Sequence, residues 1–186
     1  MRWIVALLIA AVAALGCGMA GARADQTDPR LKPLFEELRK AASPEAAMNI
    51  ELQIWALWGQ SGDASIDKVF EIGTQAMAIQ DLPTALKIFD AIVDKAPNFA
   101  EGWNKRATIH YMMHNYHASL ADIDKTLELE PQHFGALAGL GLVNLELDRD
   151  EAALDAFERV LRVDPQSQSA KQNIEFVKQR IKDKEI

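Results

Sequence analysis

The sequence predicts an all-α fold, a helix-turn-helix solenoid, and three observations lead to this fold class. Pro97, Pro131 and Pro165 stand 34 residues apart, so residues 66–167 divide into three equal units. Within the units, apolar residues recur at three- and four-residue spacing, as they do along one face of a helix. Small and large residues also recur in phase at equivalent places of the three units. Self-similarity at such a period is typical of stacked helical repeats.

The first 24 residues differ in composition from the rest of the chain. Arg2 provides a positive charge, an uncharged apolar run covers residues 3–15, and residues 22–24 read Ala-Arg-Ala, the small-x-small pattern of a signal peptidase site. We predict a signal peptide at 1–24 and therefore a periplasmic or secreted protein. The apolar run is too short to span a bilayer comfortably, so we expect no membrane insertion after cleavage.

The single cysteine, Cys17, lies inside this predicted signal peptide. Cleavage would leave no thiol, which suits an oxidising compartment because no mispaired disulfide can form. The alternative is a lipoprotein anchored through Cys17, since Leu15 and Gly16 precede it as in a bacterial lipobox. That motif prefers leucine three places before the cysteine, where this chain has Ala14.

The predicted mature chain is strongly acidic. Cleavage removes two of the 20 lysines and arginines and none of the 27 acidic residues, which changes the net charge from −7 to −9. An acidic domain repels nucleic acid and anionic lipid, so we expect neither as a partner.

Residues 25–65 are expected to form a helical hairpin ahead of the regular units. Apolar residues recur every three or four places in two runs, which Ser43 and Pro44 separate. In the 34-residue register this hairpin is degenerate, because Arg39 stands where Gly or Ala is expected and Asp63 where proline is expected. The two apolar runs consist of Leu31, Leu34, Phe35 and Leu38, and of Ala47, Ile50, Ile54, Trp55 and Trp58.

Trp55 and Trp58 lie three residues apart on the second helix of this hairpin. Two indoles on one helix face could form a platform for a ligand. Since tryptophan buries a large apolar area, we expect them instead to fill the seam against the first full unit.

The three full units are residues 66–99, 100–133 and 134–167, and residues 168–186 form a final capping helix. Each unit contains two helices, and Gly73, Ala107 and Gly141 let the paired helices approach closely. Further columns of equivalent residues are Val69, Trp103 and Leu137; Ile72, Arg106 and Leu140; Ala85, Ser119 and Ala153; and Phe89, Ile123 and Phe157.

These columns resemble the tetratricopeptide repeat (TPR) family, whose pattern is a large apolar residue, Leu-Gly, a small residue, an aromatic residue and a closing proline. The resemblance implies a non-catalytic module that binds a protein or peptide partner, without a cofactor. It also implies that the first helix of each pair lines a concave groove, which suits an extended peptide or a partner helix. The implied groove residues are Phe70, Thr74, Met77, Glu101, Asn104, Thr108, Tyr111, Met112, Leu142 and Leu145.

One specificity device of the family is absent. TPR domains that grip a terminal carboxylate use a clamp of lysines, asparagines and an arginine, but Phe70, Thr74 and Gly135 occupy three of those places here. The sequence therefore argues against binding of chaperone tails. Two alternatives remain open: the final helix fills the groove, or the chain associates with a second copy.

Three histidines suggest another function, which is binding of copper or zinc. His110 and His114 are four residues apart and could share a metal ion, and His117 follows closely. No acidic residue completes the set at a suitable spacing, so we predict no metal site and keep these histidines as the alternative. A nucleophile elbow and a phosphate-binding glycine loop are also absent, so we predict that the protein is not an enzyme.

Overall fold

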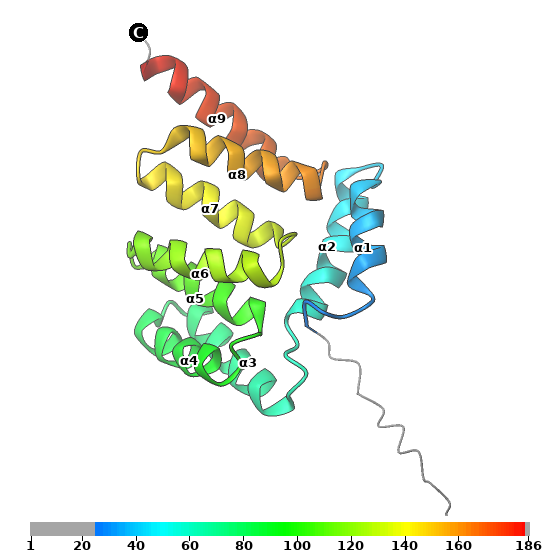
Figure 1. The fold of residues 1–186 in the computed structure, drawn as a ribbon, viewed down its shortest axis with the longest axis vertical. Coiled ribbons are helices and arrows are strands. Elements are labelled where there is room, and N and C mark those ends of the chain that lie inside the picture. Colours follow the sequence, from blue (N-terminus) through cyan, green and yellow to red (C-terminus); the bar gives the residue numbers. More distant parts are fainter. Residues whose placement is uncertain (1–24, 185–186) are drawn as a thin grey trace, which may run out of the picture.

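The computed structural model describes residues 25–184 (Figure 1). The predicted signal peptide at 1–24, with Cys17, lies outside the described residues. Residues 25–184 form nine helices and no strand, which confirms the all-α solenoid. None of these helices has the length and apolar character needed to cross a membrane. The helices are α1 (Leu31–Arg39), α2 (Pro44–Trp58), α3 (Ala64–Ala78), α4 (Leu82–Lys95), α5 (Ala100–Met112), α6 (Tyr116–Leu129), α7 (Phe134–Glu146), α8 (Asp150–Val163) and α9 (Gln168–Lys184).

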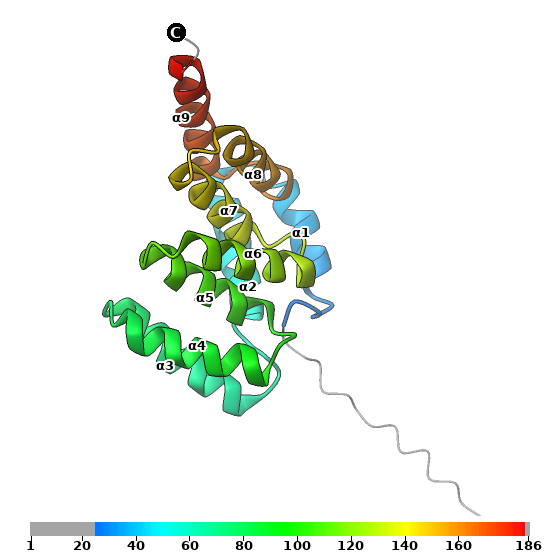
Figure 2. The same cartoon turned by 60° about the vertical axis from the view of Figure 1, so that its left-hand side comes forward.

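Helices α3 to α8 stack as three antiparallel pairs, and α9 packs on α8 at the end of the stack (Figures 1 and 2). The turn within each pair repeats the sequence period in its backbone. Gln80, His114 and Asp148 stand 34 residues apart, and their φ angles are 59°, 58° and 57°. This left-handed conformation ends the first helix of each pair and sends the chain into the second.

Close approach within a pair depends on glycine at the expected column. A Cβ atom on Gly141 would lie 2.5 Å from the Phe157 ring, and one on Gly73 would lie 2.7 Å from the Phe89 ring. Because both phenylalanines are fully buried, they have little room to move.

Gly141→Ala is therefore expected to lower the free energy of unfolding by about 1–2 kcal/mol, even though alanine has a higher helix propensity than glycine. Gly139→Ala in the same helix is the matched control, since its Cβ would make an ordinary 3.5 Å contact with Ile123. We expect that control to be neutral or stabilising by up to about 1 kcal/mol. Urea unfolding followed by circular dichroism measures both, and equal stabilities of the two variants would contradict the packing argument.

Helices α1 and α2, which we call the N-terminal clasp, run along one side of the stack (Figure 1). They pack against the third pair and α9, not beneath α3 as a further unit. The shared core contains Leu31, Phe35, Leu38, Ile54, Leu57 and Trp58 from the clasp, and Phe134, Leu137, Val160, Val163 and Ala170 from α7, α8 and α9.

Hydrogen bonds tie the clasp region to the chain shortly after each of the three repeat prolines. The amide N–H of Ala100 donates to Oε1 of Gln26 at 3.1 Å. The Arg39 guanidinium donates to Oε1 of Gln132 at 2.9 Å, and the Gln166 amide donates to the carbonyl oxygen of Ala41 at 3.0 Å. These bonds link the clasp and the residues beside it to the second and third units.

The expectation that Trp55 and Trp58 fill a seam against the first full unit is wrong. The Trp58 ring stacks on His133, the last residue of the second unit, with 4.0 Å between centroids, and it also contacts Phe134 of the third unit. Gly135 makes this docking possible, because a Cβ there would lie 2.6 Å from the Trp55 ring.

The first unit is left uncovered as a result. On α3, Val69 is 37% exposed and Ile72 is 53% exposed. Leu137, the equivalent of Val69 in the third unit, is buried.

A pair of carboxyl groups joins the clasp to the turn between α8 and α9. Glu51 on α2 lies close to Asp164, which is buried. Burial, and then the charge of Asp164, raise the pKa of Glu51 from 4.5 to about 7. The folded chain therefore keeps a proton on Glu51 that the unfolded chain loses.

Because the unfolded chain releases this proton first, stability is expected to fall as the pH rises from 4.5 to about 7. We expect a loss of about 1–2 kcal/mol, allowing for solvent screening at a half-buried group. Glu51→Gln should remove this loss and make the chain more stable at pH 8, while the exposed Glu36→Gln should not. Urea unfolding at several pH values measures the difference, and parallel pH profiles for wild type and Glu51→Gln would contradict it.

Candidate functional site

Residues of α5, α6 and α7 line a partly open cavity of about 170 Å³, which we call the α5–α7 groove. Small residues give it depth, and Ile123 and Val143 lie among its apolar lining. The other residues that line it are Asn104, Ala107, Thr108, Tyr111, Ser119, Gly135, Ala138, Gly139 and Leu142. Four of the groove residues expected from the sequence, Asn104, Thr108, Tyr111 and Leu142, therefore come together in one cavity.

The remaining expected residues lie elsewhere. Phe70, Thr74 and Met77 belong to α3, and the Phe70 ring packs edge-on against Phe89 and Phe99. Met112, at the end of α5, is 37% exposed, and Leu145 packs with the cluster beneath α9. None of these five residues lines the α5–α7 groove.

The polar side chains of the groove are held by bonds within the chain. The Thr108 hydroxyl donates to the carbonyl oxygen of Asn104 at 2.9 Å. The Asn104 amide nitrogen donates to Oε2 of Glu101, also at 2.9 Å, which fixes the direction of the amide. These bonds hold both side chains in one orientation at the groove wall.

Tyr111 connects the groove to a carboxylate at its rim. Burial raises the pKa of Tyr111, and the charge of Glu146 and a hydrogen bond to it raise it further. Glu146 also accepts a hydrogen bond from the Tyr116 hydroxyl at 3.0 Å. A negative charge thus stands beside the apolar cavity.

The clasp closes the other end of the groove. The Trp55 ring lies against Gly135, and the ammonium group of Lys105 lies 5.6 Å from its centroid. Gly135 occupies one of the lysine places of the carboxylate clamp described above. The position where such a clamp would hold a terminal carboxylate is therefore covered by tryptophan.

Glu101 lies deep in this closed end and is 2% exposed. Its carboxylate accepts a bond from Nε2 of His133 at 2.9 Å and pairs with Lys105 at 3.1 Å. Burial alone would raise the pKa of Glu101, but the bond to His133 and the charge of Lys105 outweigh it and lower the pKa. Glu101 thus interacts with residues of its own chain and does not face the open cavity.

Sequence reasoning missed His133, which organises this region. Its Nδ1 accepts the amide N–H of Ala136 at 3.1 Å and caps α7, so its Nε2 carries the proton donated to Glu101. Its residue type and its place just after a repeat proline were the only signals, because its partners Trp58 and Glu101 lie far away in the sequence.

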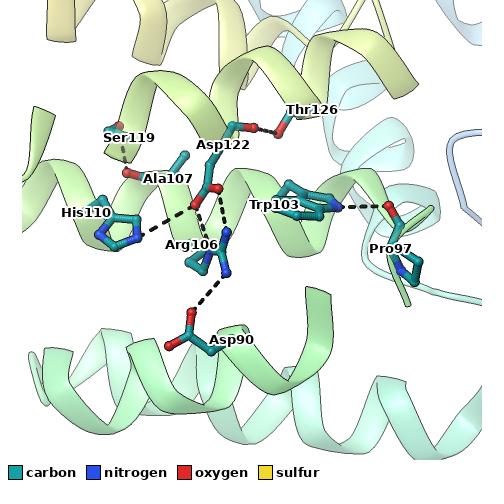
Figure 3. Close-up of polar contacts among 9 residues, drawn as sticks. All are labelled: Asp90, Pro97, Trp103, Arg106, Ala107, His110, Ser119, Asp122 and Thr126. Carbon is teal, nitrogen blue, oxygen red and sulfur yellow. Dashed lines mark hydrogen bonds and ion pairs between the residues drawn. The ribbon is translucent and has the colours of Figure 1, made fainter. Parts of the chain in front are cut away.

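A second polar network joins the first two units (Figure 3). Arg106 donates two hydrogen bonds to Asp122 on α6, at 2.7 and 2.8 Å, and one to Asp90 on α4 at 3.0 Å. The Trp103 ring lies 4.9 Å from the guanidinium carbon. Arg106 thus takes the place of the aliphatic residues Ile72 and Leu140 in the same column.

The three histidines proposed as a metal alternative do not form a ligand set. Nε2 of His110 points toward Asp122 at 3.9 Å (Figure 3), whereas Nδ1 of His114 shares a hydrogen bond with the Tyr116 hydroxyl at 2.8 Å. His117 lies on the exposed first turn of α6. Within residues 25–184 no three His, Cys, Asp or Glu side chains gather as metal ligands.

Comparisons with known sequences agree with the repeat pattern. A family model described as tetratricopeptide repeat matches residues 104–168. A TPR repeat-containing protein of Rhizobium etli is 33% identical over 152 residues, which covers 82% of this chain and 74% of the relative. DnaJ homolog subfamily C member 3 of Homo sapiens is 30% identical over 110 residues, covering 59% of this chain but only 22% of that protein.

Solved structures share the fold at low sequence identity. The Sgt2 TPR domain from Aspergillus fumigatus has a TM-score of 0.63 and 20% identity, covering 66% of this chain and 83% of that chain. The first TPR of Spaghetti (RPAP3), bound to the HSP90 peptide SRMEEVD, has a TM-score of 0.62 and 18% identity, covering 64% and 95%. A MamA double mutant has a TM-score of 0.59 and 19% identity over 83% and 84%.

Proposed function

Because this chain belongs to the tetratricopeptide repeat family, we propose that it is a non-catalytic scaffold that captures a protein or peptide partner in its concave face. The observation that carries this proposal is the α5–α7 groove, in which Asn104, Thr108, Tyr111 and Leu142 line one open cavity. Solved TPR domains with the same fold are bound to HSP90 and HSP70 peptides, which supports a peptide ligand here.

The partner is expected to differ from those peptides. Trp55 covers Gly135, and the lysine and asparagine places of the clamp hold Phe70 and Thr74. A terminal carboxylate would therefore meet an indole, a phenyl ring and a hydroxyl group instead of the lysine and asparagine side chains of the clamp. The lining of this groove suits a ligand that presents apolar side chains better than one that presents a terminal carboxylate.

We further propose that the scaffold works in the bacterial envelope after export. Support comes from the apolar run and the small-x-small pattern within residues 1–24. N-terminal sequencing of the protein from fractionated cells is expected to find a mature chain starting at Asp25 in the periplasm. A lipid-modified Cys17 at the N-terminus would favour the lipoprotein alternative, and an intact Met1 in the cytoplasm would contradict export.

Affinity capture from envelope extract tests the binding proposal. The chain is compared with the double variant Asn104→Ala, Tyr111→Ala, and with Thr108→Arg, which places bulk and charge at an exposed groove position. Both variants should lose the captured partner while keeping their helicity. Lys87→Ala with Glu158→Ala, at exposed positions on α4 and α8, is the control and should retain it. Equal recovery on all four proteins would contradict capture through the groove.

A further inference from the structure

The α5–α7 groove has the size and the chemistry of a pocket for one apolar side chain. Its inner walls are Ala107, Ala138, Gly139 and Leu142, so a Leu, Met or Phe side chain would displace water from apolar surface there. Trp55 closes one end over Gly135, which leaves the side toward Tyr111 for the rest of a ligand.

The groove also offers a hydrogen-bond acceptor. Asn104 is 7% exposed, and its amide nitrogen is already bonded to Glu101. That bond uses one of the two amide hydrogens and fixes the amide, so a ligand can use the second hydrogen or the oxygen. A backbone N–H of a bound segment could donate to it.

The charge at the rim is negative. Glu146 stands beside Tyr111, and no Lys, Arg or His side chain of residues 25–184 forms an ion pair with it. Elsewhere in the described chain, Lys105 pairs with Glu101 at the closed end of the groove, and Arg180 pairs with Asp148 and Asp150. The predicted mature chain as a whole carries a charge of −9, which adds to the attraction for a cation.

This inference rests on the proposed function: we propose that the partner segment is a basic amphipathic peptide. It places one large apolar side chain in the α5–α7 groove and a lysine or arginine at Glu146. The apolar side chain supplies most of the affinity, and the cation supplies orientation and selection against acidic segments.

The test uses two fluorescein-labelled peptides of equal length, one of leucine and lysine and one of leucine and glutamate. Fluorescence anisotropy with the purified chain should show the leucine–lysine peptide binding at least about tenfold more tightly. Ala138→Leu, which fills the groove, should weaken that binding by about tenfold or more. Glu146→Gln should weaken it by about three- to fivefold and reduce its salt dependence.

Ala121→Leu is the matched control, because Ala121 is exposed on α6 and does not line the groove. It should bind as wild type. If Ala138→Leu binds the leucine–lysine peptide as well as Ala121→Leu does, the attraction is nonspecific and the proposal is wrong. If the leucine–glutamate peptide binds equally well and Ala138→Leu abolishes it, the basic partner class is overturned while the groove remains the binding site.

Discussion

Trp58→Ala is expected to lower the free energy of unfolding by about 3–5 kcal/mol. The side chain is 1% exposed and lies between Phe35 of the clasp and the residues at the start of α7, His133 and Phe134. Its removal leaves a cavity in the core that joins the two parts. Urea unfolding followed by circular dichroism measures the loss.

Phe176→Ala is the matched control, since this aromatic residue is 57% exposed on α9 and its loss should change stability by less than about 0.5 kcal/mol. Hydrogen exchange adds a local measurement. In the Trp58→Ala variant the amides of α1 and α2 should exchange faster than those of α4 and α6. If Trp58→Ala has the stability of Phe176→Ala, the clasp is not part of the core.

Arg106→Ala is expected to cost about 2–4 kcal/mol, because it leaves the buried carboxylate of Asp122 without its cation. The side chain of Asp122 is 5% exposed, whereas that of Asp90 is 54% exposed and can remain hydrated. Most of the loss should therefore come from Asp122. Urea unfolding at neutral pH measures it.

A second variant separates the unpaired charge from lost packing. Arg106→Leu combined with Asp122→Ala removes both charges and restores the aliphatic residue found in the other two units. We expect this double variant to recover at least half of the stability lost in Arg106→Ala. A double variant no more stable than Arg106→Ala would mean that packing of the arginine, and not the ion pair, holds the first two units together.

The regular part of the fold was predictable because its determinants repeat at a fixed interval. The prolines at 97, 131 and 165, and the small residues Gly73 and Gly141, mark the same structural positions in successive units. The docking of the clasp was not predictable from that pattern. Trp58 and His133 lie 75 residues apart, and no periodic signal relates them.

Two departures from the repeat pattern were nevertheless visible in the leading hairpin. Arg39 stands where a small residue would let paired helices approach, and it instead reaches Gln132 at a unit boundary. Asp63 stands where a proline would close a unit, and it instead caps α3 by accepting the Ser65 amide. Both departures indicate a hairpin that leaves the stack.

The candidate site was predictable in part for the same reason. The repeat register, read with the resemblance to the TPR family, gives Asn104, Thr108, Tyr111 and Leu142 lining places, and these residues do line one cavity. It could not show that Glu101 would be covered, because Trp55 comes from outside the register. Contacts between distant segments decide which part of the groove stays open.

Site-specific photocrosslinking in cells tests the central claim most directly, namely that the concave face holds a partner. A photoreactive phenylalanine replaces Thr108, which is exposed at the groove, or Ala121, which is exposed on α6. The account predicts a discrete crosslinked adduct from position 108 and none from position 121. Adducts from position 121, with none from position 108, would contradict it and move the binding surface to the opposite side of the solenoid.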